Sequence, residues 1–119
     1  MMTGYRKGLR GLEGIELTCF QIISAVGAAR SMYIEAIQEA KHGKTIEAKA
    51  MIDEGNTLFQ EGHHAHAHLI QSEASGNAVA VNLLLMHAED QLMSAEGFRV
   101  IAEEFIDLYE ILANRKELA

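Results

Sequence analysis

The sequence predicts an all-α protein built from three long antiparallel helices, and three observations support that fold class. Proline is absent from the 119 residues. Apolar residues make up 49% of the chain, and they recur at the three- and four-residue intervals of amphipathic helices. Only two polar, glycine-containing breaks divide the pattern, at 42–45 and 72–77. We therefore expect one domain over 1–119, with a flexible N-terminal segment over 1–13.

The first helix is expected from about Leu12 to Lys41. A basic residue in the last turn, followed by Gly43, is typical of a helix C-terminus. The apolar seam of this helix comprises Leu12, Ile15, Cys19, Ile22, Val26, Ala29, Tyr33, Ala36 and Ala40. Its regular spacing indicates one face that is buried against the other helices.

The second helix is expected from about Thr45 to Gln71, with Thr45 as its N-cap. Its apolar pattern is weaker than that of the first helix. Gly55 and Gly62 each lower its intrinsic helicity by roughly 1 kcal/mol relative to alanine. This helix should therefore depend on packing against its neighbours.

The third helix is expected from about Ala78 to Asn114, with Asn77 as its N-cap, and it carries two apolar lines. The first line comprises Val81, Leu85, Ala88, Leu92, Ala95, Phe98, Ala102, Phe105, Tyr109 and Leu112. The second line comprises Val79, Leu83, Met86, Asp90, Met93, Gly97, Ile101, Leu108 and Ile111. One line suffices for packing within three helices, so the second indicates an interface with further chains and hence an oligomer.

Charge and cysteine content exclude several classes of function. The formal net charge is -7, with ten basic against seventeen acidic residues, so nucleic acid is not an expected partner. The single cysteine, Cys19, excludes an internal disulfide and fits a reducing compartment. We identify no signal peptide and no uninterrupted apolar run of the roughly 20 residues that span a bilayer. A cytoplasmic protein is expected.

Four of the six histidines lie between His63 and His68. On a helix, His64 and His68 share one face, and His63 and His66 share another. The cluster is either a partly exposed histidine-rich turn with adventitious zinc or nickel affinity, or a contributor to an active site. A di-iron carboxylate centre is not favoured, although Glu-x-x-His occurs at Glu39–His42 and Glu61–His64, because that centre needs four helices.

His87 and Asp90 are the strongest candidate site residues. They are three residues apart, and therefore on the same general side of a helix, in an otherwise apolar segment. A lone histidine there is either a core side chain or a reactive group. Asp90 interrupts the second apolar line, and no lysine or arginine follows it before Arg99. If that line packs around a symmetry axis, copies of Asp90 meet and need a cation or a shared proton; otherwise Asp90 is solvated.

These residues carry a resemblance to a known family. The stretch Leu84-Leu85-Met86-His87-Ala88-Glu89-Asp90-Gln91-Leu92-Met93 resembles the active-site motif of the IIA components of the lactose/cellobiose (chitobiose) class of the bacterial sugar phosphotransferase system. Further similarities follow in the family's order. They are Ile22-Ile23, Gly27, Ala29-Arg30-Ser31 and Glu35-Ala36 in the first helix, and Leu69-Ile70-Gln71 with Glu73-Ala74-Ser75-Gly76 at the end of the second.

The resemblance implies a phosphotransferase component that forms a homotrimeric nine-helix bundle. It implies that His87 is phosphorylated by the phosphocarrier protein HPr and passes the phosphoryl group to a cysteine of a IIB component. That component phosphorylates a lactose-, cellobiose- or chitobiose-type sugar entering through the membrane IIC. It also implies that Asp90 from each of three subunits binds a divalent cation, expected to be magnesium, at the trimer axis.

The chain departs from the family pattern in its basic, glycine-containing N-terminus and in two further places. Where family members often have Ala-His-x-x-Gln-Thr, the stretch 62–67 reads Gly-His-His-Ala-His-Ala, so two polar residues are replaced. Gln91 stands where an aromatic residue or histidine is frequent. Within this stretch His63 is a possible active-site contributor. The alternative function is a non-enzymatic helical metal-binding or regulatory protein that uses the histidine cluster.

Overall fold

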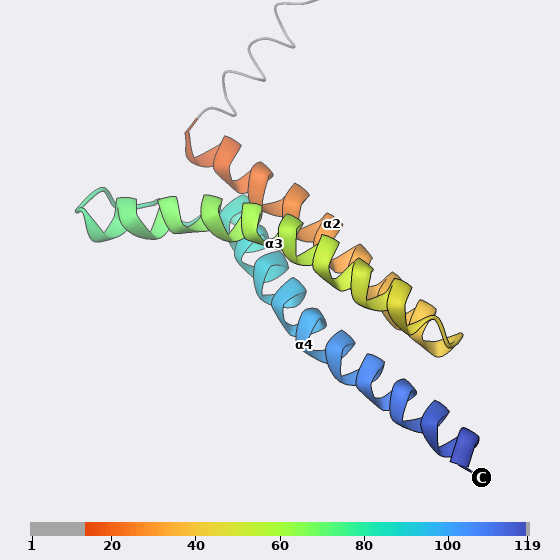
Figure 1. Ribbon diagram of the computed structural model, residues 1–119. Coiled ribbons are helices and arrows are strands. Elements are labelled where there is room, and N and C mark those ends of the chain that lie inside the picture. Colours follow the sequence, from red (N-terminus) through yellow and green to blue (C-terminus); the bar gives the residue numbers. More distant parts are fainter. Residues whose placement is uncertain (1–13, 119) are drawn as a thin grey trace, which may run out of the picture.

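The protein consists of three long helices in a computed structural model that describes residues 14–118. They are α2 (Ile15–Lys41), α3 (Thr45–Ala74) and α4 (Leu83–Leu118), and no strand occurs within those residues (Figure 1). The predicted all-α fold is confirmed. The segment 1–13, predicted to be flexible, lies outside the described residues, as does Leu12 of the first seam.

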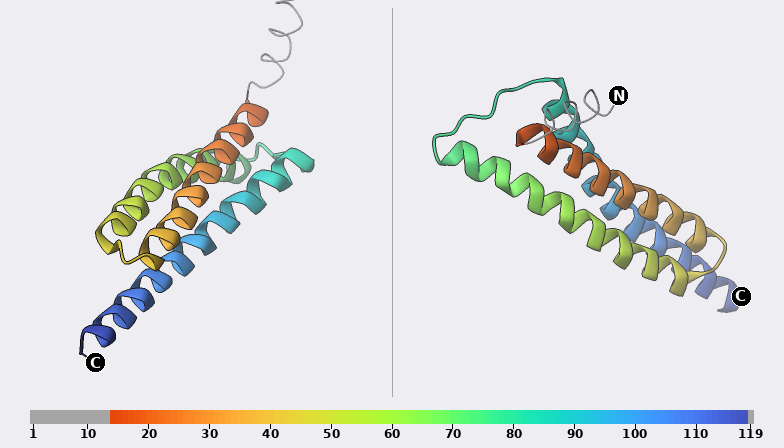
Figure 2. Two further views of the ribbon diagram at one scale, coloured as in Figure 1. Left: turned by 90° about the vertical axis from the view of Figure 1, so that its right-hand side faces the viewer. Right: turned by 90° about the horizontal axis from the view of Figure 1, so that it is seen from above.

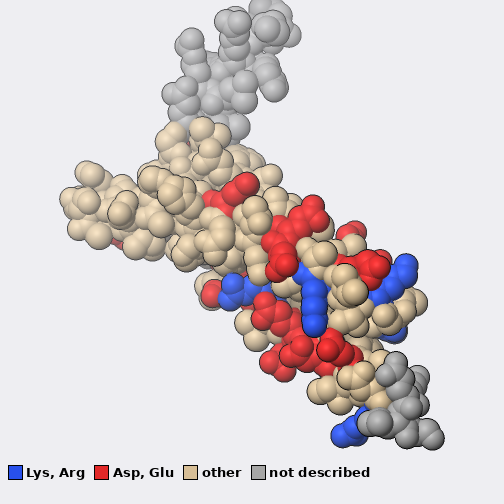
Figure 3. All heavy atoms as spheres, viewed as in Figure 1, with Lys and Arg blue, Asp and Glu red and all other residues tan. Residues whose placement is uncertain are grey.

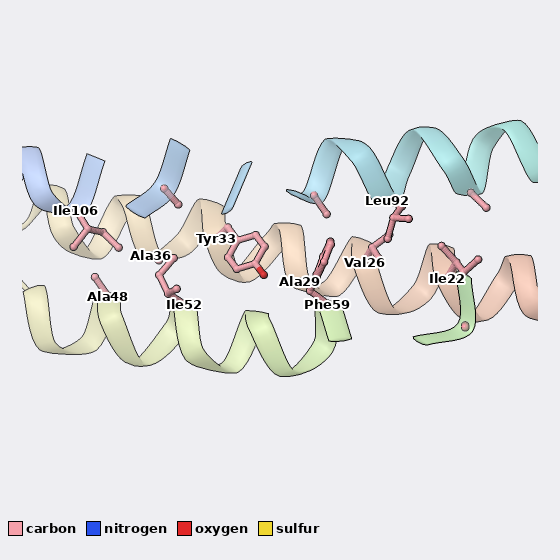
Figure 4. Packing of buried hydrophobic residues seen from close by; sticks show 14 of the residues in the cluster. Ile22, Val26, Ala29, Tyr33, Ala36, Ala48, Ile52, Phe59, Leu92 and Ile106 are labelled. Atoms are coloured by element: carbon pink, nitrogen blue, oxygen red, sulfur yellow. The ribbon is translucent and has the colours of Figure 1, made fainter. Parts of the chain in front are cut away.

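The helix α2 is the centre of the bundle. It packs against both α3 and α4, whereas α3 and α4 contact each other least. Consecutive helices run in opposite directions, so α4 runs parallel to α2, and its C-terminal part extends beyond the other two helices (Figure 2). A close view of the core shows α2 between α3 and α4, with Val26 and Leu92 pointing toward one another (Figure 4).

The apolar seam predicted for the first helix is the core of the molecule. Every seam residue from Cys19 to Ala40 is buried, while Ile15, at the start of α2, is 37% exposed. Tyr33 is the largest fully buried side chain. Its hydroxyl donates a hydrogen bond to Asn56 Oδ1 of α3 at 2.7 Å, which satisfies the one polar atom of this ring in the core.

Two glycines of α3 allow it to approach α2 closely. A Cβ atom at Gly62 would lie 2.5 Å from Val26 Cγ1, and one at Gly55 would lie 2.7 Å from Cε1 of Tyr33. Both glycines are buried. The intrinsic helicity lost at these positions is therefore offset by backbone contact with the central helix, in agreement with the predicted dependence of this helix on packing.

The two predicted N-caps are wrong. Thr45 is already the first residue of α3, and Lys44 occupies the cap position without a side-chain hydrogen bond. The helix α3 continues to Ala74, and Gly76 then adopts a φ of 91°, which ends the helical geometry. The helix α4 therefore begins only at Leu83. Asn82, not Asn77, caps α4, since its Oδ1 accepts a hydrogen bond from the Leu85 N–H at 2.9 Å.

Three polar contacts join α3 to α4 at three levels. They are Lys49 with Glu110 (3.2 Å between Nζ and Oε2), Phe59 with Arg99 (5.7 Å from Cζ to the ring centroid) and His66 with Glu89 (2.7 Å between Nε2 and Oε1). As residue numbers rise along α3 they fall along α4, as expected for antiparallel helices. The contacts therefore set the register between the two helices that pack least on each other.

The two apolar lines of α4 differ in burial. The first is buried through its middle, at Ala88, Leu92, Ala95 and Ala102, although its ends at Val81, Phe105 and Leu112 are exposed. Ile106, which neither line contained, is also buried. The second line is exposed from Leu83 onward and includes Leu83 (82%), Met86 (58%), Met93 (67%), Ile101 (47%), Leu108 (47%) and Ile111 (51%). One helix thus has a packed face and an uncovered apolar face.

The central helix α2 is also long and apolar enough to cross a membrane by those two criteria alone. Its most apolar 18-residue window reaches a mean hydropathy of 1.2. A core helix of a helical bundle meets the same criteria, and α2 packs against a helix on each of two sides. This finding agrees with the sequence, which contains no uninterrupted apolar run of that length, because polar residues such as Gln21, Arg30 and Glu35 interrupt α2.

Candidate functional site

His87 lies in the second turn of α4 and is exposed. Within the described part of the chain, no hydrogen bond or ion pair engages its ring. The core-histidine alternative is therefore excluded, because a buried imidazole would need partners for its ring nitrogens. An accessible, unengaged imidazole is a group that another protein could reach.

Asp90 is one turn further along α4 and is also exposed, between Met86 and Met93 of the uncovered apolar face. Among the described residues no lysine or arginine pairs with it. Nor do these residues contain a group of three or more His, Cys, Asp or Glu side chains that could bind a metal ion. A cation at Asp90 would therefore need carboxylates from other chains.

The histidine cluster divides among three surroundings. His63 is exposed and stacks on Phe59, with 6.2 Å between ring centroids. His64 and His68 meet edge to face at 5.0 Å, as predicted for residues that share a face. His66, predicted to share a face with His63, instead contacts α4. The cluster therefore does not act as one unit within the described chain.

The contact between His66 and Glu89 was not foreseen from the sequence. Their Nε2 and Oε1 atoms are 2.7 Å apart, although the residues are 23 positions apart in the chain. Glu89 also acts on the core, because burial raises the pKa of the Cys19 thiol and the negative charges of Glu89 and Glu16 raise it further. Cys19 is 1% exposed. It is thus a neutral, enclosed thiol and a poor nucleophile near pH 7.

A cation from α2 lies on the same side of α4 as His87. Arg30 Nη1 donates a hydrogen bond to Ser94 Oγ at 3.3 Å. Ser94 follows His87 by seven residues, which is two helical turns on one face. Among the described residues Arg30 has no acidic partner within ion-pair distance.

Two open grooves border the helices that carry these residues. The larger, of about 710 Å³, lies between α2 and α3 and includes His64 and His68. The smaller, of about 380 Å³, is formed by the end of α3, the 75–82 connection and the start of α4, and it includes Met86 and Glu89 on either side of His87 in the sequence. On the face shown in Figure 3, basic and acidic groups are mixed over the middle of the molecule, without an extended basic stripe.

Comparison with known proteins gives a consistent family. Residues 17–110 match the family described as "PTS system, Lactose/Cellobiose specific IIA subunit". A relative from Bacillus subtilis, the oligo-beta-mannoside-specific EIIA component, is 40% identical over 95 residues, which are 80% of this chain and 86% of the relative.

Solved structures agree with the sequence match. The PTS cellobiose-specific enzyme IIA from Bacillus anthracis has a TM-score of 0.81 at 43% identity, covering 83% of this chain and 91% of that chain. The IIA(chitobiose) of Escherichia coli, solved in complex with HPr, has a TM-score of 0.74 at 34% identity, covering 85% and 98%. The chain therefore belongs to the lactose/cellobiose-specific IIA family and is a phosphotransferase component.

Proposed function

We propose that this chain is a cytoplasmic phosphocarrier that accepts a phosphoryl group from HPr on His87 and passes it to a cysteine of a IIB component. The observation that carries the proposal is the exposed His87 on α4, inside the family's motif. A structural relative was solved as a complex with HPr, which supports HPr as the donor. The buried, neutral Cys19 leaves histidine as the better nucleophile.

The first transfer exchanges one P–N bond for another. A ring nitrogen of His87 attacks the phosphorus of phosphohistidine on HPr as the P–N bond to HPr breaks. The bonding electrons return to the HPr ring, which gains a proton, and the His87 ring loses one. A thiolate of the IIB component then attacks the phosphorus, and an S–P bond forms as the P–N bond to His87 breaks. The bonding electrons return to the His87 ring, which regains a proton. Transfer of this kind depends mainly on positioning and on stabilising spread negative charge.

We propose a homotrimer in which the exposed apolar face of α4 lies at the three-fold axis. This face places Asp90 among methionines, where three copies would bring three carboxylates together. Oxygen ligands of that kind fit a hard divalent cation such as Mg²⁺, which would offset their charge at the axis. His63, exposed on α3, is a weaker candidate that could donate a hydrogen bond to the phosphoryl group.

The metal proposal has its own test in Asp90→Leu. This change should abolish Mg²⁺ binding in titration calorimetry, and it should preserve or strengthen the trimer because it removes a clustered charge. The matched control is Asp107→Leu, an exposed aspartate of the same helix. A monomeric Asp90→Leu variant would contradict the packing of α4 at the axis.

For the sugar, we propose the lactose, cellobiose or chitobiose class. The relatives' names include oligo-beta-mannoside, lichenan, lactose and N,N'-diacetylchitobiose. Proteins of one family thus serve different sugars. The choice among them is proposed to lie in the membrane IIC component, which the phosphoryl group reaches through IIB.

The test is phosphoryl transfer from labelled phosphoenolpyruvate in the presence of the system's enzyme I and HPr. The parent chain should take up label, His87→Ala should take up none, and His68→Ala, which changes another exposed histidine, should match the parent. Undiminished labelling of His87→Ala would remove His87 from this role.

The alternative, a non-enzymatic metal-binding or regulatory protein that uses the histidine cluster, is less well supported. Membership of a family of phosphotransferase components favours the phosphocarrier. Within the described chain the four clustered histidines divide among three surroundings and form no set of three metal ligands.

A further inference from the structure

One contact between helices lies beside the proposed phosphoryl acceptor without taking part in the transfer. His66 of α3 and Glu89 of α4 are 2.7 Å apart between Nε2 and Oε1. This distance falls in the range of charge-assisted hydrogen bonds, which are about twice as strong as neutral ones. The side chains are 17% and 40% exposed, so the contact is partly shielded from water.

Few other contacts hold the start of α4. The preceding connection, 75–82, is not helical, and Leu83 and Met86 are 82% and 58% exposed. Before Ala88, the first fully buried residue of the helix, Leu84 and Leu85 pack against the core, and both are only partly buried. The first turns of α4, which carry His87, are therefore oriented by few apolar contacts and by Glu89.

The groups around Glu89 come from all three helices. Cys19 of α2 lies near enough that, beside burial, the negative charge of Glu89 raises the pKa of its thiol. From α3 comes His66, the one basic side chain among the described residues that pairs with Glu89. The anchoring of Glu89 within the described chain therefore depends on His66.

We propose that His66 and Glu89 form a positioning pair, which fixes the first turns of α4 to α3 and so holds His87 in the orientation that the phosphoryl donor requires. This inference rests on the proposed function. Residues two apart on a helix leave it on nearly opposite sides. Glu89 can therefore anchor α4 on the side of α3 while His87 stays free on the other side.

The test measures phosphorylation of His87 by phospho-HPr in Glu89→Ala, His66→Ala, the double variant and Glu89→Gln. Each alanine variant should lower the rate at saturating HPr by about tenfold, with the half-saturating HPr concentration unchanged, because orientation and not binding is lost. The double variant should fall no further. Glu89→Gln, which still accepts a hydrogen bond, should recover most of the rate.

Two variants serve as matched controls. Glu96→Ala removes an exposed glutamate of α4 that has no ion pair within the described chain, and His68→Ala removes an exposed histidine of α3. Both should retain the parent rate. If Glu89→Ala lowers only the melting temperature and keeps the parent rate, or if the two alanine effects add, the contact is structural and the inference is overturned.

Failure of the proposed function would look different, because the parent itself would then take no phosphoryl group. In that case the role of the His66–Glu89 pair is tested by amide hydrogen exchange over residues 84–90. Glu89→Ala should accelerate exchange there by about tenfold, as expected when a local anchor is lost, and Glu96→Ala should not. Unchanged exchange in Glu89→Ala would overturn the inference by this second measurement.

Discussion

The two faces of α4 carry apolar residues of different size, and only one of the two faces is buried in the single chain. The packed face is built from three alanines together with Leu92 and Ile106, and it is buried. The other face carries larger side chains such as Met93 and Ile101, and it is exposed in the single chain. Small residues let two helices of one chain approach closely, whereas an uncovered stripe of large residues indicates an interface with other chains.

The largest effect is expected from a charged residue placed on the exposed face of α4. Ile101→Glu should dissociate the proposed trimer into single chains, because it would bring three like charges together in an apolar interface. Such a burial costs at least several kcal/mol. Native mass spectrometry would detect the change from three chains to one. A variant that retains three chains would show that this face is not the interface.

The buried face should respond in stability and not in assembly. Leu92→Ala removes a side chain that is 6% exposed and should lower the free energy of unfolding by about 2–4 kcal/mol. Urea unfolding at fixed protein concentration measures the loss. The control Met93→Ala, made in the Ile101→Glu background so that the proposed trimer is absent, should change the free energy of unfolding by less than about 0.5 kcal/mol.

A pair of glycines sharpens the same contrast. Gly62→Ala places a methyl group 2.5 Å from Val26 Cγ1, so it should destabilise the protein by about 1–3 kcal/mol. Gly97 lies on the exposed face of α4 with nothing within 4 Å of a built Cβ. In the Ile101→Glu background, where the proposed trimer is absent, Gly97→Ala should therefore stabilise the helix by up to about 1 kcal/mol. Thermal unfolding of both variants measures the two changes in stability. A larger loss of stability in Gly97→Ala than in Gly62→Ala would contradict the contrast between the two faces.

The smallest effect concerns pH. Burial holds the pKa of Cys19 above its ordinary value of 9.0. The unfolded chain therefore loses the thiol proton first, and stability should fall as the pH rises above 9, by at most about 1.4 kcal/mol per unit. Unfolding followed from pH 7 to 10 in the parent and in Cys19→Ala measures this contribution. Equal slopes in the two proteins would show that the thiol does not contribute.

The core face of α2 could be predicted from the sequence because a buried stripe leaves a regular three- and four-residue spacing. Helix starts could not, since Asn77 and Asn82 are equally good caps in isolation and the difference depends on how far α3 continues. His87 and Asp90 stand out as polar residues in an apolar segment. The partnership of His66 with Glu89 left no such mark, because it depends on the register between two helices that are distant in sequence.

The most direct test of this account is to locate the phosphoryl group on the parent chain after incubation with phospho-HPr. Mass spectrometry under alkaline conditions, which preserve phosphohistidine, can distinguish the six histidines. The account predicts modification at His87 alone. A phosphoryl group on His63 or His66, or on no histidine, would contradict it.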